Sequence, residues 1–214
     1  TGFMSGEHQI RRVLEFLDIF YKKDTLLLVD PVMGDNGNRY PIFTSELVAE
    51  MKSLVSRADI ITPNLTELCL LTDTDYRMIK VMTEEKHLVT VAEQMARNLM
   101  TEGTKEVLVT GIRFTDEESG QEMMGNLAVT KDGASFSAFP FIGESFSGTG
   151  DLFASVIAGG KARGDKLPDT MKLAGEMIER AIRTSVKNHV PRNDGVDYEQ
   201  YLWMLGEKNR LKQE

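Results

Sequence analysis

The sequence predicts an α/β fold with a mostly parallel central sheet, flanked by helices and extended by an antiparallel hairpin at one edge. Three observations lead to this prediction. Short apolar runs typical of buried strands alternate with segments of helical periodicity, the pattern of crossover connections between parallel strands. Two later runs are joined by a tight turn. A Gly-Thr-Gly sequence then opens a long helical region that closes the fold.

The first half of the chain alternates helix and strand. We expect a helix from Ser5, which can cap it, to about Lys22, because apolar residues recur every three or four positions. Residues 26–29 then form an apolar run typical of a strand covered on both faces. The pattern repeats twice, with helices at 45–56 and 90–102 leading into strands at 60–63 and 107–110.

The second half changes from crossover helices to a hairpin. Residues 123–130 and 134–140 are predicted strands, joined by a turn at 131–133. Two helices follow, from Asp151 to about Arg163 and from Pro168 to about His189. The remaining expectations are a loop or short extra helix at 73–85 and a frayed tail at 207–214.

The composition agrees with one globular domain and excludes several classes of partner. The chain has 214 residues, of which 41% are hydrophobic and 27% charged, enough to bury a core. Its formal net charge of −8 repels nucleic-acid phosphates and anionic membranes, so we expect neither as a partner. One cysteine, Cys69, cannot form an intrachain disulfide, and we find no export signal. These features predict a cytoplasmic protein.

Polar residues follow each predicted parallel strand. Because ligands of open α/β sheets bind beyond the carboxyl ends of the strands, we expect these residues to converge on one rim. They lie in three segments, Asp30-Pro31-Val32-Met33-Gly34-Asp35, Thr62-Pro63-Asn64-Leu65-Thr66-Glu67 and Thr110-Gly111.

The sequence Gly148-Thr149-Gly150-Asp151 predicts a phosphate site with a base beside it. A Gly-x-Gly pair alone is weak evidence, but here it opens a helix, where backbone N–H groups lack partners and the helix dipole favours anions. Asp151 in the first turn would stay ionised. It could then accept a proton from a hydroxyl group that attacks the phosphate.

Each of these residues also has an ordinary structural interpretation. Asp151 could only cap its helix. Asp35 and Asn36-Gly37 could be turn residues, and Glu67 could be the first-turn acid of a helix after Pro63. It is the occurrence of all of them in one chain that favours a functional site.

Three motifs, Asp30–Asp35, Ile61–Glu67 and Gly148–Phe153, resemble in order and separation those of the ribokinase-like vitamin kinases, most closely those that act on pyridoxal. The resemblance runs from Thr1 to about His189. It implies one kinase domain over residues 1–214 that lacks the family's opening strand and small lid. The implied activity is ATP-dependent phosphorylation of the hydroxymethyl group of pyridoxal, by a homodimer that binds small molecules only.

The resemblance also implies a role for each candidate residue. Asp151 would take the proton from the substrate hydroxymethyl group, and the amides of Gly148, Thr149 and Gly150 would hold the transferring phosphoryl group. Asp30, Asp35 and Glu67 would lie near Mg²⁺, and a monovalent cation such as K⁺ is a further expected cofactor. The nucleotide would contact Asp30, Asp35, Tyr40, Thr62, Asn64, Glu67, Thr110 and Phe146, and Phe3 would lie against the pyridine ring.

Two alternatives stay open. The first is a hydroxymethylpyrimidine kinase of thiamine synthesis, in which the residue after Gly-Thr-Gly is often cysteine, so that Asp151-Leu152-Phe153 favours pyridoxal. The second is a module that binds nucleotide or vitamer without turnover. Such a module would have no need for a carboxylate beside the phosphate site.

Overall fold

The computed structural model describes residues 1–82, 84–101, 103–143 and 145–206. Its centre is a five-stranded sheet with the order β1-β4-β5-β6-β7. β1 (Leu28–Val29), β4 (Ile60–Ile61) and β5 (Glu106–Thr115) pair in parallel, whereas β6 (Glu122–Thr130) and β7 (Gly133–Pro140) add an antiparallel hairpin to β5. The predicted α/β class and edge hairpin are therefore confirmed, in a mixed sheet.

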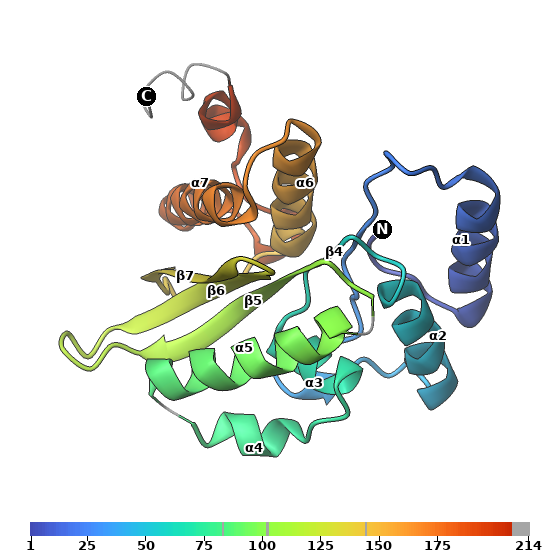
Figure 1. Ribbon diagram of the computed structural model, residues 1–214. Coiled ribbons are helices and arrows are strands. Elements are labelled where there is room, and N and C mark those ends of the chain that lie inside the picture. The colour runs from blue at the N-terminus through green and yellow to red at the C-terminus, as the bar shows by residue number, and fades with distance from the viewer. Residues whose placement is uncertain (83, 102, 144, 207–214) are drawn as a thin grey trace.

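Helices cover both faces of the sheet (Figure 1). One face carries α6 (Thr149–Ala162) and α7 (Leu167–Lys187), and the other carries α3 (Leu65–Leu71) and α5 (Glu85–Thr101). The remaining helical segments are α1 (Glu7–Phe20), α2 (Ser45–Val55), α4 (Tyr76–Lys80) and the short 3-10 helices η1 (Arg192–Asp194) and η2 (Glu199–Leu205). Among the described residues no helix is long and apolar enough to cross a membrane.

Successive strand residues point into different layers of the core. Leu28, Ile60 and Leu108 belong to the cluster under α6 and α7. Their neighbours Val29, Ile61 and Val109 belong to the larger cluster on the opposite face. Because side chains alternate along a strand, a strand packed on both faces must be apolar at every position. This accounts for the continuous apolar runs in the sequence.

Several predicted boundaries were wrong. The cap of α1 is Gly6, because the hydroxyl of Ser5 donates to Gln9 Oε1 at 3.0 Å instead of capping the helix. α5 begins at Glu85 rather than residue 90: the predicted helix left out the polar residues Glu85 to His87 and also Leu88, which is buried in the core. β5 continues past residue 110 to Thr115, because a register shift between Val109 and Ile112 lets it resume pairing with β6.

A small hairpin between β1 and α2 was not predicted. β2 (Gly34–Asp35) and β3 (Asn38–Arg39) pair antiparallel around Asn36 and Gly37, whose φ angles are 52° and 79°. The interpretation of Asn36-Gly37 as turn residues is therefore confirmed. The short helix expected within 73–85 is α4, and the predicted tail at 207–214 lies outside the described residues.

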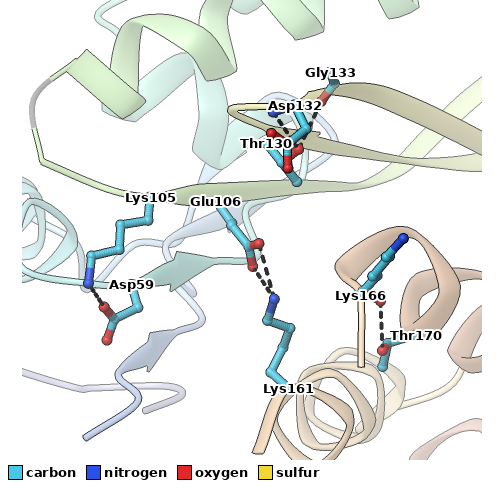
Figure 2. Close-up of polar contacts among 9 residues, drawn as sticks. All are labelled: Asp59, Lys105, Glu106, Thr130, Asp132, Gly133, Lys161, Lys166 and Thr170. Carbon is cyan, nitrogen blue, oxygen red and sulfur yellow. Dashed lines mark hydrogen bonds and ion pairs between the residues drawn. The ribbon is translucent and has the colours of Figure 1, made fainter. Parts of the chain in front are cut away.

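Ion pairs close the end of the sheet where the parallel strands begin (Figure 2). Asp59, just before β4, accepts a bond from Lys105 Nζ at 2.5 Å and one from the Leu27 N–H at 2.8 Å. Glu106, the first residue of β5, lies 2.9 Å from Lys161 at the end of α6. With this end occupied by structural contacts, the opposite rim is left for the site.

Candidate active site

All the site residues predicted from the sequence line one cavity of about 470 Å³ at the carboxyl ends of β1, β4 and β5. They are Phe3, Asp30, Asp35, Tyr40, Thr62, Asn64, Glu67, Thr110, Phe146, Gly148, Thr149, Gly150 and Asp151. Residues that are far apart in the sequence, from Phe3 to Asp151, thus line the same cavity.

Asp30 follows β1 and is buried at the base of the cavity. Its Oδ1 accepts a hydrogen bond of 2.9 Å from the hydroxyl of Thr62, which follows β4. Burial raises the pKa of Asp30 to about 6, and the negative charge of Asp151 adds to this shift, while the bond from Thr62 opposes it. Asp30 is therefore a carboxyl group that titrates near neutral pH and faces a second carboxylate.

Asn64 and Glu67 form a reciprocal cap at the start of α3. Asn64 Oδ1 accepts from the N–H groups of Thr66 and Glu67 at 2.8 and 3.0 Å, and Glu67 Oε2 accepts from the Asn64 N–H at 2.8 Å. Glu67 is thus the first-turn acid of its helix, as its ordinary interpretation required, and it also lines the cavity.

The same two side chains fix the loop after β1. Glu67 Oε1 accepts from the Met33 N–H at 3.1 Å, and Asn64 Nδ2 donates to the Gly34 carbonyl at 2.9 Å. Tyr40 is held beside this loop by its N–H, which donates to the Met33 carbonyl at 2.9 Å. Two motifs that are about thirty positions apart therefore form one rigid unit.

Glu67 has the larger pKa shift of the two buried acids. Burial raises its pKa to about 8, and the nearby charge of Asp30 raises it further, against the effect of the bonds from Asn64 and Met33. A cation placed in the cavity would favour the ionised form of both acids. The site is thus built to gain from a bound positive charge.

The donor set fits Mg²⁺ with incomplete protein ligation. Asp30, Asp35 and Glu67 all line the cavity and offer oxygen atoms only, which suits this hard cation. Across the described residues, no group of three or more His, Cys, Asp or Glu side chains is placed to hold a metal by itself. Mg²⁺ commonly keeps several waters and takes phosphate oxygens as ligands, so such a site agrees with an ion that arrives with a nucleotide.

The amino end of α6 opens into the cavity. Its cap is Gly148, with φ of 79°, and none of the described side chains caps it. The first N–H groups of a helix have no intrahelical partners, so those of Thr149 to Asp151 are available to an anion. Asp151 is therefore not the cap, and its capping interpretation was wrong. A Cβ atom at Gly148 or Gly150 would meet nothing within 4 Å, so the backbone is approachable there.

Three of the predicted aromatic residues line the cavity. Phe3 is 55% exposed and packs edge to face on Phe43, with 6.3 Å between ring centroids. Phe146 is buried against Ala181 and Val196, so only part of it faces the cavity. Tyr40 also lines the cavity, and 38% of it is exposed.

An apolar wall of the cavity, formed by β7, the two residues that follow Pro140 and α7, was not predicted from the sequence. It includes Phe139, Phe141, Ile142, Ile178 and Ile182. These residues follow the same apolar spacing as the core, so nothing in the sequence marked them. Asn126 was also missed, although a polar residue inside an apolar strand is a usable signal; its Oδ1 accepts from the Gly111 N–H at 3.3 Å.

The cavity is acidic. Its lining, as far as the structure describes the chain, contains the carboxyl groups of Asp30, Asp35, Glu67, Asp151 and Glu179 and no lysine, arginine or histidine. A polyphosphate would therefore be repelled unless a metal ion and the helix amides offset the charge.

The comparisons with known proteins agree with this geometry. The model of the phosphomethylpyrimidine kinase family matches residues 1–194. A crystal structure assigned to this kind of kinase from Bacteroides thetaiotaomicron VPI-5482, in a form with pyridoxal, is 32% identical with a TM-score of 0.82, covering 96% of this chain and 69% of that one. The pyridoxal kinase from Lactobacillus plantarum is 26% identical with a TM-score of 0.80, covering 100% and 72%.

Among curated proteins, the pyridoxine/pyridoxal/pyridoxamine kinase of Bordetella avium (strain 197N) is 32% identical over 160 residues, which are 75% of this chain and 46% of that protein. The chain spans about half the length of the curated relatives it matches. The resemblance to vitamin kinases drawn from the three motifs is confirmed. Since the family model covers most of the sequence, the chain belongs to the phosphomethylpyrimidine kinase family.

Proposed function

We propose that the protein transfers the γ-phosphoryl group of ATP to the hydroxymethyl group of pyridoxal, giving pyridoxal 5′-phosphate and ADP. The observation that carries this proposal is the meeting of the Asp151 carboxylate and the uncapped amino end of α6 in the cavity that Asp30, Asn64 and Glu67 also line. Asp151 would accept the proton of the substrate hydroxyl as its oxygen attacks the γ-phosphorus and the bond to the ADP oxygen breaks.

The amides of Thr149 and Gly150 would stabilise the charge on the phosphoryl oxygens during the transfer. Bound Mg²⁺ would supply the positive charge that the lining lacks, with Asp30, Asp35 and Glu67 near it and with waters and nucleotide oxygens among its ligands. We also propose that a monovalent cation such as K⁺ binds as a second ion.

Different parts of the lining would bind the two ligands in this proposal. Phe3 would lie against the pyridine ring, and the apolar wall would receive the flat adenine base. Tyr40, Thr62, Thr110 and Phe146 would complete the nucleotide site. We further propose a cytoplasmic homodimer; the buried, unpaired thiol of Cys69 agrees with a reducing compartment.

A coupled assay of ADP release tests the proposal. With pyridoxal as acceptor the protein should release ADP in a Mg²⁺-dependent reaction and form an equal amount of pyridoxal 5′-phosphate. The matching family is named for a related pyrimidine, phosphomethylpyrimidine, so hydroxymethylpyrimidine belongs in a parallel reaction as the competing acceptor. Turnover of the pyrimidine alone would overturn the choice of substrate. Tight pyridoxal binding without ADP release would identify a non-catalytic binding module.

A further inference from the structure

The segment after α7 contacts the loop that leads into the Gly-Thr-Gly sequence. Arg192 Nε donates to the Ser145 carbonyl at 2.8 Å, and Arg192 Nη2 donates to the Ser145 hydroxyl at 2.5 Å. The Ser147 N–H in turn donates to the Arg192 carbonyl at 2.9 Å. Three hydrogen bonds thus join Arg192 to Ser145 and Ser147, two residues of the loop that leads into α6.

Apolar contacts support the same loop from the other side. Phe146, between the two serines, is 4% exposed and packs in a small cluster with Ala181 and Val196. Val196 belongs to the same segment as Arg192 and is also buried. The loop is therefore held by the hydrogen bonds of Ser145 and Ser147, on either side of Phe146 in the sequence, and by the packing of Phe146 itself.

The loop determines where the amides of the phosphate site point. Gly148 follows Ser147 directly, and the Thr149 hydroxyl donates back to the Phe146 carbonyl at 3.1 Å. A shift of the loop would therefore move the first N–H groups of α6. Amide donors stabilise a developing oxyanion only when they lie about 2.7–3.1 Å from it, so small displacements cost rate.

We propose that Arg192 is a positioning residue for phosphoryl transfer: its guanidinium group fixes Ser145 and, through the loop, the amides of the α6 amino end. This inference rests on the function proposed above. In the hydrogen bonds described, Arg192 contacts Ser145 and Ser147 and none of the acidic residues of the lining, so it would act on the reaction through this loop.

Because Arg192 is exposed, its effect on turnover can be told apart from an effect on the stability of the fold. Hydrogen bonds of an exposed, flexible side chain contribute little to the free energy of unfolding. Loss of the guanidinium group should therefore leave the melting temperature almost unchanged. It should act mainly on kcat, because the amides are needed most when charge develops on the phosphoryl oxygens.

The test compares Arg192→Ala with Arg192→Lys and with a matched control, Arg163→Ala. Arg163 also donates to a backbone carbonyl of the C-terminal segment, that of Leu205 at 2.9 Å, but it lies outside the cavity lining. For Arg192→Ala we expect kcat to fall about 10- to 100-fold, with KM for pyridoxal changing less than about threefold. Arg192→Lys should be intermediate, because an ammonium group cannot bond both Ser145 acceptors in the same fork. Arg163→Ala should keep the kcat of the wild type.

Amide hydrogen exchange of the region 145–152 provides a readout that does not depend on turnover. Exchange should rise in Arg192→Ala and stay unchanged in Arg163→Ala. Normal kcat in Arg192→Ala, or unchanged exchange in this region, would overturn the positioning role. If the wild type fails to phosphorylate pyridoxal, the proposed function is wrong, whereas the exchange comparison still decides whether Arg192 orders the loop.

Discussion

A Cβ atom placed on Gly2 would lie 3.3 Å from Oδ1 of Asp151, so the backbone of Gly2 borders the proposed catalytic base directly. This contact is tighter than an ordinary van der Waals distance. Only hydrogen at this position lets the carboxylate keep its place without displacement.

Gly2→Ala should therefore displace the Asp151 carboxylate and lower kcat. A shift of a few tenths of an ångström at a proton acceptor justifies an expected loss of about 10-fold in steady-state turnover. Gly6→Ala is the matched control, since a Cβ there would meet nothing within 4 Å and its φ of −169° suits any residue. Equal kcat values in the two variants would show that the Gly2 contact does not constrain Asp151.

Asp151→Asn tests the base itself. Asparagine cannot accept the hydroxyl proton, so kcat should fall about 10²- to 10⁴-fold while ATP affinity changes little. Asp169→Asn is the control, because Asp169 is a first-turn acid of α7 that lies outside the cavity lining. Calorimetry with a non-hydrolysable nucleotide, alongside the turnover assay, separates binding from chemistry. An Asp151→Asn variant with near-normal kcat would remove this residue from the reaction.

Glu67→Gln should affect both metal dependence and stability. A neutral amide is a poorer partner for Mg²⁺ and its waters, so the Mg²⁺ concentration for half-maximal activity should rise. Because a glutamine side chain has one acceptor oxygen, it cannot accept from both the Met33 and Asn64 N–H groups. We expect a loss of about 1–3 kcal/mol in the free energy of unfolding, measured in urea.

Glu46→Gln controls for the loss of a first-turn acid, since Glu46 occupies that position in α2 away from the cavity. Its Mg²⁺ dependence should match that of the wild type. If Glu67→Gln needs no more Mg²⁺ than the wild type, Glu67 has only a structural role, in the reciprocal cap of α3.

Asp30 should make stability depend on pH. Its pKa is raised from 3.8 to about 6 by burial, so between these values the folded protein binds a proton that the unfolded chain has lost. The free energy of unfolding contributed by Asp30 is therefore highest below pH 4 and falls as pH rises to about 6, by about 2–3 kcal/mol. Asp30→Asn, which can still accept the bond from Thr62, should abolish this change.

The measurement is the difference in unfolding free energy between wild type and variant at pH 4, 5, 6 and 7. Asp59 provides a contrasting control: it is buried too, and burial raises its pKa, but Lys105, the Leu27 N–H and Tyr21 lower it more. The difference between wild type and Asp59→Asn should be flat over this range. A flat profile for Asp30→Asn as well would contradict the raised pKa.

The polar residues at the carboxyl ends of the parallel strands could be predicted because the signal for each lies within a few neighbouring residues. An apolar run followed by Asp30, Thr62 or Thr110 identifies both a strand and the residue that follows its carboxyl end. Parallel pairing then brings these ends together, so the grouping of Asp30, Thr62 and Thr110 followed from spacing alone.

The apolar half could not be predicted, because Phe139 and Ile178 carry the same signal as core residues. Their exposure to the cavity depends on how α7 lies on β7, which is a tertiary property. The bond between Arg192 and Ser145 is equally hidden, since nothing in either neighbourhood indicates a contact across 47 positions. The hairpin at Asn36-Gly37 was the opposite case, where a local signal existed and was interpreted only as a turn.

The acidic lining has an effect after the transfer as well as before it. In the proposed reaction an uncharged hydroxymethyl group becomes a phosphate ester that carries about −1.5 to −2 charges at neutral pH. This ester is formed beside Asp151 and near Asp30, in a cavity whose described lining has no cationic side chain. Once Asp151 has released the proton that it accepted, Coulomb repulsion favours departure of the product over its retention. The carboxylates that make the site dependent on a metal ion would thus also drive product release and shorten the time for which product occupies the site.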